Sequence, residues 1–209
     1  MSRHFNTRSK FIAAVAAAAG AVALVPSVAS ANTWFGSSLN HEPANAGSSC
    51  NPDDSVPPPM CTHIGSFYPG TSGRVKSPVN GTIVAFRVFA QGPTTMTFKL
   101  VRVRNVSADH EHGQARVVAK GRTVQVQGPT QAQQDDGTFQ IERFPVHLKV
   151  HKGDEIAIDT TSNTAEYCSD GTPGQLTFTP SLGMRNSFRS STSVDTCLML
   201  VQAVARAGH

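Results

Sequence analysis

Apolar and polar residues alternate along most of the chain that follows Ser77. A period of two residues is typical of a β-strand with one buried face and one exposed face. No segment shows a 3.6-residue apolar period with helix caps. Seven predicted strands lie in VNGTIVAFRVFA, TTMTFKLVRVRNV, ARVVAKGRTVQVQ, TFQIERFPVHLKV, EIAID, QLTFT and TCLMLVQAVARA. The pattern therefore predicts an all-β fold, a two-sheet antiparallel sandwich of the jelly-roll type.

Two of these predicted strands carry apolar residues on both faces. In VNGTIVAFRVFA, the residues Val84, Phe86 and Val88 alternate with further apolar residues, which favours a central strand covered on both sides. In TTMTFKLVRVRNV the apolar positions change from even to odd numbers after Leu100. A change of phase by one residue predicts a β-bulge or a strong bend at that point.

The first 31 residues have the layout of an export signal. A basic start is followed by an apolar run over residues 11–25, and Ala29-Ser30-Ala31 supplies the small residues of a cleavage site. The run of 15 residues is shorter than the roughly 20 that a membrane-spanning helix needs. No second apolar run follows, so we predict a secreted protein that is cleaved after Ala31 and has no membrane span.

Removal of the signal changes the length and the charge of the chain. It leaves 209 − 31 = 178 residues, enough for one domain. Residues 32–74 are rich in Ser, Asn, Pro and Gly and are predicted to form a loop-rich extension before a β-sandwich over residues 75–209. The signal holds 3 of the 18 Lys and Arg and no acid, so the remaining charge is 15 − 14 = +1. A nearly neutral chain gives little support to a nucleic-acid partner, and none is predicted.

All four cysteines lie after the predicted signal, and export would place them where thiols oxidise. Four cysteines allow three pairings, and the sequence does not decide among them. We favour Cys50 with Cys61, which bracket the Pro-rich loop CNPDDSVPPPMC, and Cys168 with Cys197. Zinc is the alternative, but the chain has no C-x-x-C pair.

Two kinds of polar loop are candidates for a metal site. The segment ADHEHGQ, residues 108–114, alternates histidine and carboxylate, as a divalent metal would require. A solvated turn that ends in glycine has the same composition. Calcium is a further alternative in the loops around Asp135-Asp136-Gly137 or Asp170. The turn is the simpler interpretation of ADHEHGQ, and calcium in the other loops stays open, so no metal or cofactor is predicted.

Basic and aromatic residues are the candidates for ligand binding. The middle third of the chain is basic and could attract an anionic polymer such as an acidic glycan. Its cations are Arg87, Lys99, Arg102, Arg104, Arg116, Lys120 and Arg122. Sugar-binding sandwiches stack their ligands on exposed aromatic rings, which makes Trp34, Tyr68 and Tyr167 candidates as well. The ligand-binding candidates are therefore Trp34, Tyr68, Tyr167, Arg102 and Arg104.

The densest charged segment is VHLKVHKGDEIAIDT, residues 146–160. Parity places Val146, Leu148, Val150, Ile156 and Ile158 inward and the charged residues outward. A hairpin with the loop Lys152-Gly153-Asp154 would pair His151 with Glu155 and His147 with Asp159. In an arch, where the two strands join different sheets, those pairs never meet. In both cases we expect exposed charges and a structural turn rather than a site.

The segment LKVHKGDEIAID resembles the v-x-v-x-x-G-D-x-i-x-i turn of many jelly-roll and carbohydrate-binding-like sandwiches. The wider layout runs from ANTWFGSSLNHEPAN through a cysteine pair, NGTIVAFRV and the KGD turn to CLMLVQAVA. It resembles a group of secreted bacterial β-sandwich proteins of unassigned function. The resemblance implies a sandwich fold and an extracellular location, and it carries no functional residue across.

Catalytic motifs are absent from the sequence. There is no G-x-S-x-G, H-E-x-x-H or Gly-rich phosphate loop, and Glu142, Glu155, Asp159 and Glu166 have the spacing of a solvent-facing strand surface. We therefore expect a non-catalytic secreted module that binds an extracellular or cell-surface ligand, for example a glycan, or has a structural role. The alternative is an extracellular hydrolase assembled only in the fold, with His147 or His151 beside a distant serine.

Overall fold

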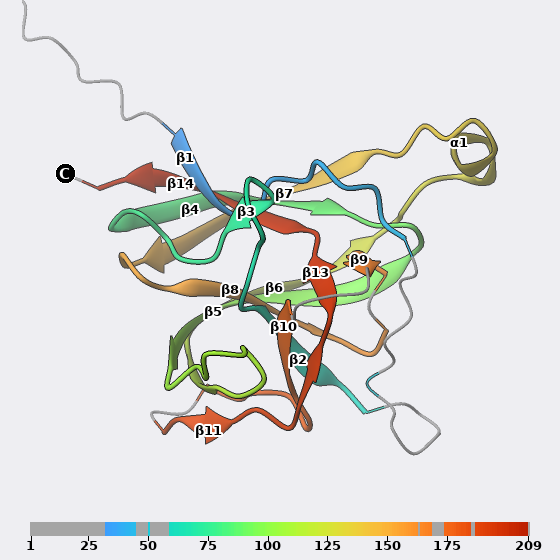
Figure 1. The fold of residues 1–209 in the computed structure, drawn as a ribbon. Helices are drawn as coiled ribbons and strands as arrows, with labels where there is room; N and C mark the ends of the chain where they lie inside the picture. Colours follow the sequence, from blue (N-terminus) through green and yellow to red (C-terminus); the bar gives the residue numbers. More distant parts are fainter. Residues whose placement is uncertain are drawn as a thin grey trace, which may run out of the picture.

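The computed structural model describes residues 32–44, 50, 59–162, 164–168, 174–184 and 187–208. These residues form antiparallel β-sheets and one short helix (Figure 1). The predicted export signal and its cleavage site lie outside the described residues.

The strands form three sheets in which all neighbouring strands are antiparallel. The five-stranded sheet contains, in spatial order, β3 (Gly73–Arg74), β1 (Asn32–Ser37), β14 (Val201–Ala207), β4 (Gly81–Phe89) and β7 (Ile141–Val150). The seven-stranded sheet contains β11 (Arg189–Ser190), β6 (Gln114–Val126), β5 (Thr94–Arg104), β8 (Glu155–Thr160), β2 (Cys61–Gly65), β10 (Gln175–Phe178) and β12 (Ser193–Asp195). The third sheet pairs β13 (Cys197–Met199) with β9 (Glu166–Cys168). All seven predicted strand segments are confirmed.

The loop-rich segment 32–74 also contributes strands that its composition did not predict. β1 pairs with β14 inside the five-stranded sheet, and β2 lies between β8 and β10 in the seven-stranded sheet. The short helix α1 (Gln131–Asp135) was not predicted either. Thr130 and Gln133 form a reciprocal capping box at its start, and this T-x-x-Q spacing was its only signal in the sequence.

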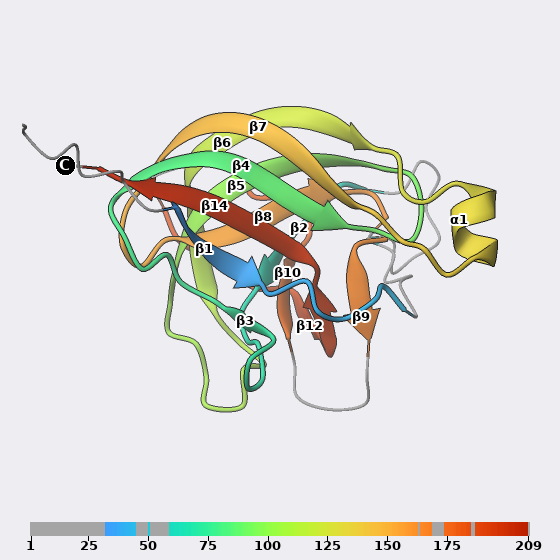
Figure 2. The same ribbon diagram turned by 90° about the horizontal axis from the view of Figure 1, so that it is seen from above.

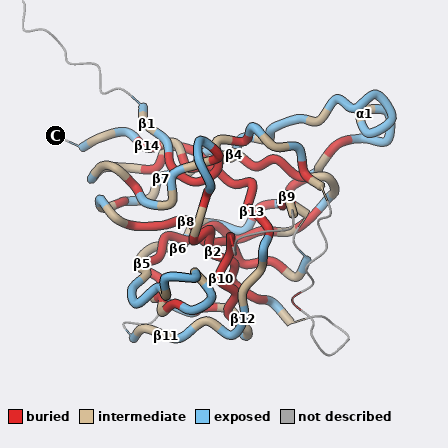
Figure 3. The backbone as a smooth tube through the Cα atoms, in the orientation of Figure 1, coloured by how far each residue is buried: buried red, intermediate tan, exposed pale blue. Residues whose placement is uncertain are grey.

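The main core lies between the two large sheets, where the tube in Figure 3 is buried. Phe86 of β4 stacks on Phe98 of β5 with ring centroids 4.3 Å apart. Val146 and Leu148 of β7 pack against the same core, as their parity predicted. Alternation along each strand therefore positions the five-stranded sheet with one face buried.

A second core lies on the other face of the seven-stranded sheet. It contains Val101, Ala157 and Leu176, and Leu182 of the loop after β10 covers it. Residues 189–195 supply both outermost strands of this sheet, β11 and β12, so the sheet curls into a half-barrel around the second core. The phase change predicted after Leu100 has this cause, because β5 contributes its even positions to the main core and its odd positions to the second. The register also shifts between Leu100 and Val101, which confirms the predicted irregularity.

Among the described residues, most of the outer face of the five-stranded sheet is open, and in Figure 2 no other labelled element lies over β14 and β4. The end of β4 is an exception, because Phe89 is 8% exposed and packs with Leu39, Leu200 and Phe139. The prediction that the strand around Phe86 is covered on both sides therefore holds only at that end. A register shift between Ile83 and Ala85 changes the phase of β4, so that Ile83, Phe86 and Val88 all enter the main core.

Both predicted disulfides are present. Cys50 bonds to Cys61, and Cys168 bonds to Cys197 across the small sheet in which the two cysteines are register partners. Disulfides form and persist in oxidising compartments. Within the described residues, no helix has the length and apolar character needed to cross a membrane.

The KGD segment is an arch and not a hairpin. β7 belongs to the five-stranded sheet and β8 to the seven-stranded sheet, so neither predicted histidine–carboxylate pair forms. Gly153, at φ +92°, adopts the left-handed conformation that the arch needs. The Ser77 carbonyl oxygen accepts from the Gly153 N–H, and the Ser77 N–H donates to the carbonyl oxygen of Asp154. The expectation that all these charges are exposed is wrong, because Asp154, Glu155 and Asp159 are each at most 3% exposed. Other segments of the chain therefore pack over this face of β8.

Candidate anion-binding surface

Folding buries more of the acidic side chains than of the basic ones. The described residues include 14 Lys and Arg, of which only Lys99 is buried. They include 11 Asp and Glu, of which Asp154, Glu155, Asp159 and Glu166 are buried. The cations that reach solvent thus outnumber the acids by 13 − 7 = 6, against 14 − 11 = 3 before burial is considered. The surface is therefore more basic than the composition indicates.

Arginines are lined up across the open face of the five-stranded sheet. One register row crosses all five strands through Arg74, Gly36, Gln202, Arg87 and Arg143. Arg74 and Arg143 are exposed, and Arg87 donates from Nη1 to the Oε1 atom of Gln202 at 2.8 Å. Gly36 has φ +90° and lies so close to the β14 backbone that a side chain would collide with it. The row is therefore cationic at both ends and across β4.

Two further rows run parallel to this arginine row. The middle row is mostly apolar and consists of Trp34, Val204, Ala85 and Pro145. The next row consists of Asn32, Arg206, Thr82 and Lys149, and both of its cations are exposed. On β1 and β14 neighbouring rows are two residues apart, which is about 7 Å along a strand. At the register shift between β4 and β7 the last row is farther away, and His147 lies between Pro145 and Lys149 on β7. An apolar strip with one tryptophan thus lies between two cationic strips.

The outward positions of the five strands themselves carry no acid. The five strands contain one carboxylate, Glu142, which is opposite the inward residue Val88. It accepts hydrogen bonds from the backbone N–H groups of Gln127 and Gly128 at 2.9 and 2.8 Å. Arg87 and Arg143 are direct cross-strand neighbours, an arrangement that costs stability for like charges. An anionic ligand would relieve that repulsion.

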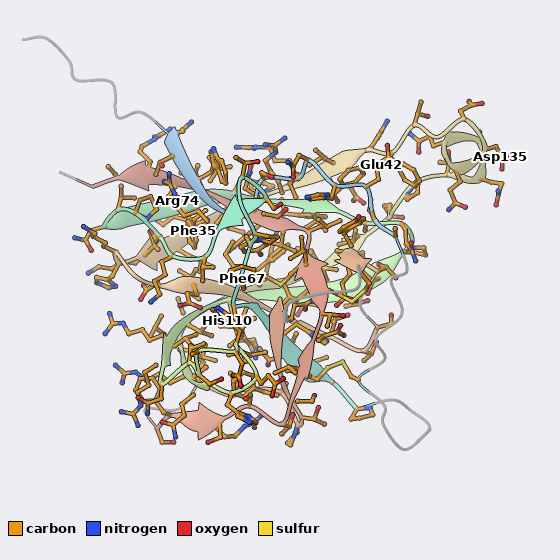
Figure 4. The ribbon with its side chains drawn as sticks, viewed as in Figure 1. Phe35, Glu42, Phe67, Arg74, His110 and Asp135 are labelled. Atoms are coloured by element: carbon orange, nitrogen blue, oxygen red, sulfur yellow. A yellow bond between two sulfur atoms is a disulfide. The ribbon has the colours of Figure 1, made fainter. Side chains whose placement is uncertain are left out.

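The three aromatic candidates lie in different environments. Trp34 is 39% exposed on the open face, and the guanidinium carbon of Arg74 is 5.9 Å from its ring centroid; Figure 4 shows Arg74 beside β3 and β1. Tyr167 is half-buried and stacks on His41 at 4.7 Å. Tyr68 is 7% exposed and donates its hydroxyl to the carbonyl oxygen of Met199 at 3.1 Å, so the expectation that it stacks on a ligand is wrong. Only Trp34 belongs to the cationic face.

The predicted basic cluster is divided between several places. Arg87 lies on the open face, whereas Lys99 is buried in a contact with Asp159 and the carbonyl oxygen of Leu182. Burial lowers the pKa of Lys99. Arg102 and Arg104 lie at the end of β5, where Arg104 is 4.0 Å from the ring centroid of Phe188. The predicted pair Arg102 and Arg104 is therefore on the other large sheet from Trp34.

Hollows follow the seam where β6 and β7 face each other. One has a volume of about 490 Å³ and is lined by Lys120, Gly121, Arg122, Pro145, Val146, His147 and Leu148. The next has a volume of about 330 Å³ and is lined by Arg102, Arg116, Val117, Val118, Ala119, Lys149, His151 and Met184. Neither lining contains an acid. Arg116 and Lys120 of the predicted cluster thus lie along this seam.

The loops that were considered as metal sites make contacts within the protein instead. Asp109 accepts hydrogen bonds from the Ser107 hydroxyl and the Glu111 N–H, which lower its pKa, and His110 packs on Phe67 with centroids 4.8 Å apart (Figure 4). Asp135 lies at the end of the projecting arm that carries α1 (Figure 4). Asp170 lies outside the described residues. Among the described residues, groups of three potential ligand atoms occur only beside the two disulfides, with His63 and with Glu166.

The histidines and carboxylates considered for a hydrolase are also dispersed. In the part of the chain that the structure describes, neither the His147 ring nor the His151 ring bonds to a serine. Glu155, Asp159 and Glu166 are buried, so their expected place on a solvent face is wrong. Burial raises the pKa of Glu155 to about 8. His63 is buried beside the Cys50–Cys61 disulfide, and burial lowers its pKa to about 4.

The chain matches no protein-family model and no curated protein. The functional argument therefore rests on the site itself. Sequence reasoning identified Trp34 as an exposed aromatic candidate but missed Arg74, Arg143 and Arg206, because their common face depends on the register of five strands.

Proposed function

We propose that this protein is a secreted, non-catalytic module that binds an acidic polysaccharide on the open face of its five-stranded sheet. One observation carries the proposal: an apolar strip with Trp34 lies between two cationic strips, and no acid faces outward among them. The two disulfides and the export signal predicted over residues 1–31 support an extracellular location.

The three strips match the chemistry of an acidic glycan. A sugar ring has an apolar face that stacks on aromatic and aliphatic side chains, here Trp34, Val204 and Pro145. Carboxylates at the edges of the ring would meet Arg74 and Arg143 on one side and Arg206 on the other. A neutral glycan would leave those cations unpaired, so the charge of the polymer decides its affinity.

Retention on polysaccharide beads tests the proposal. The secreted chain is applied to polygalacturonate beads and to neutral dextran beads in 0.15 M and 1 M NaCl. We expect retention on polygalacturonate alone, and we expect it to weaken at 1 M salt, where charges are screened within about 3 Å. At about 0.5–1 kcal/mol for each exposed ionic contact, the double variant Arg74→Gln/Arg143→Gln should bind about five- to thirtyfold more weakly.

A charge-matched variant provides the control. Arg104→Gln/Arg122→Gln removes two exposed cations from the seven-stranded sheet and leaves the open face intact. We expect this variant to bind polygalacturonate like the unmodified protein, and Trp34→Ala to bind it more weakly in both salts. Equal losses in the two arginine pairs would show that only net charge matters. That result, or retention on neither bead, would contradict the proposal.

A further inference from the structure

We propose that the hollow between β6 and β7 that contains Arg102 is a separate binding site for a single phosphate or sulfate group. It has a volume of about 330 Å³ and lies where the two large sheets part. Arg102 and Arg116 come from the seven-stranded sheet, and Lys149 and His151 come from the end of β7. Side chains from both sheets thus converge on one space.

The two arginines of this hollow are held close together by the sheet. Arg102 and Arg116 are direct register partners in the β5–β6 pair, where like charges oppose each other at a cost in stability. The Arg116 guanidinium carbon is 5.1 Å from the centroid of Phe188, which supports it from one side. A bound anion would turn this unfavourable pair into a favourable one.

A buried carboxylate positions two of the lining residues. Asp154 is 1% exposed, and its Oδ1 atom accepts from Nε of Arg102 at 3.1 Å. Its Oδ2 atom accepts from the backbone N–H of His151 at 2.8 Å, and the ring nitrogen Nδ1 lies 3.6 Å from the same oxygen. Arg102 and His151 are still 44% and 45% exposed, so their remaining donors face the hollow and solvent. Asp154 therefore holds Arg102 and His151 in position before an anion binds.

Charge and shape favour a compact tetrahedral anion. Arg102, Arg116 and Lys149 carry three positive charges and Asp154 one negative charge, which leaves 3 − 1 = +2. A planar carboxylate has two oxygen atoms, which one arginine can occupy. Donors that converge from two sheets suit the three or four oxygen atoms of phosphate or sulfate, free or as an ester. The inference goes beyond the glycan face, because Arg102 and Arg116 do not belong to that face and only Lys149 is common to both.

Calorimetric titration of the secreted chain with inorganic phosphate, sulfate and acetate tests the inference. We expect one saturable phosphate or sulfate site and at least tenfold weaker binding of acetate. Arg102→Gln should weaken phosphate binding at least tenfold, since it removes a charge-assisted donor. Arg122→Gln is the matched control, because this exposed arginine lies on β6 outside the hollow and should leave phosphate binding unchanged. Absence of saturable binding, or equal effects of the two variants, would overturn the inference.

The positioning role of Asp154 needs its own measurement. Asp154→Asn should weaken phosphate binding, and its loss should not add to that of Arg102→Gln in the double variant, because both act through one guanidinium group. Fully additive losses would contradict that role. The two proposals can be refuted independently. If the protein binds phosphate but is not retained on polygalacturonate, only the proposal of the glycan face is refuted. The converse result would refute only the hollow.

Discussion

The buried carboxyl group of Glu155 allows a test of how burial changes a pKa and, through it, the stability of this fold. The carboxyl group is 2% exposed, and its one ion-pair partner, the Lys76 ammonium, is 3.9 Å away on a side chain that is 63% exposed. Burial therefore outweighs Lys76 and raises the pKa to about 8 from 4.5. The folded protein keeps the proton between these two pH values, whereas the unfolded chain loses it. Stability must fall as pH rises through this interval.

The size of this effect follows from the same pKa values. Each pH unit between the two pKa values is worth about 1.4 kcal/mol, so between pH 5 and pH 9 the loss is about 4 kcal/mol. Glu155→Gln removes the titrating group and retains the shape of the side chain. We expect similar stability of the two proteins at pH 5 and a variant more stable by about 4 kcal/mol at pH 9.

Urea denaturation of both proteins at pH 5, 7 and 9, with disulfides intact, measures this difference. His63, with a pKa lowered by burial to about 4, adds a loss of stability below pH 6.5, but it does so equally in both proteins. The comparison of the two proteins cancels that contribution. Parallel pH profiles for the variant and the unmodified protein would show that Glu155 is ionised in the folded state, and the argument from burial would be wrong.

Two further predictions concern stability. Lys99→Met leaves the Asp159 carboxylate buried without its cation and should lower the free energy of unfolding, measured in urea, by about 3–5 kcal/mol. The double variant Lys99→Met/Asp159→Leu should recover most of that loss. A single variant within about 1 kcal/mol of the unmodified protein would contradict this prediction. Dithiothreitol should lower the melting temperature by about 10 °C or more, because the loops between the bonded cysteines span 11 and 29 residues and contribute about 3 kcal/mol each. An unchanged melting temperature would mean that the crosslinks contribute little.

Alternation was sufficient to predict β4, β7 and β14, because each of them buries one face in the main core, but it did not predict β1 of the same sheet. It misled at Glu155 and Asp159, where parity predicted the face opposite Ile156 and Ile158 correctly. Parity does not say whether a second layer covers that face. The loop that carries Leu182 lies over Asp159, and the segment that carries Lys76 pairs with Glu155; both are distant from β8 along the chain and left no local signal.

The candidate site was predictable only in part, for a related reason. Trp34 stood out as a rare aromatic residue, whereas Arg74, Arg143 and Arg206 were not singled out. Their neighbours across the sheet depend on the register of β1, β14, β4 and β7, which joins distant segments such as Gly36 with Gln202 and Arg87 with Arg143. A one-residue shift at the bulge in β4 would place Arg87 in the core. Positions of this kind are set by long-range pairing and not by local pattern.

The edge position of β7 has a consequence for solubility. β7 pairs only with β4, so its other side offers unpaired backbone groups to any passing chain. Pro145 lacks an N–H donor there, and Arg143, His147 and Lys149 give the strand a charge that repels a second copy of itself. The cations that we assign to ligand binding would thus also prevent sheet-to-sheet aggregation. Neutralising them to test binding should be accompanied by a check that the variants stay monomeric.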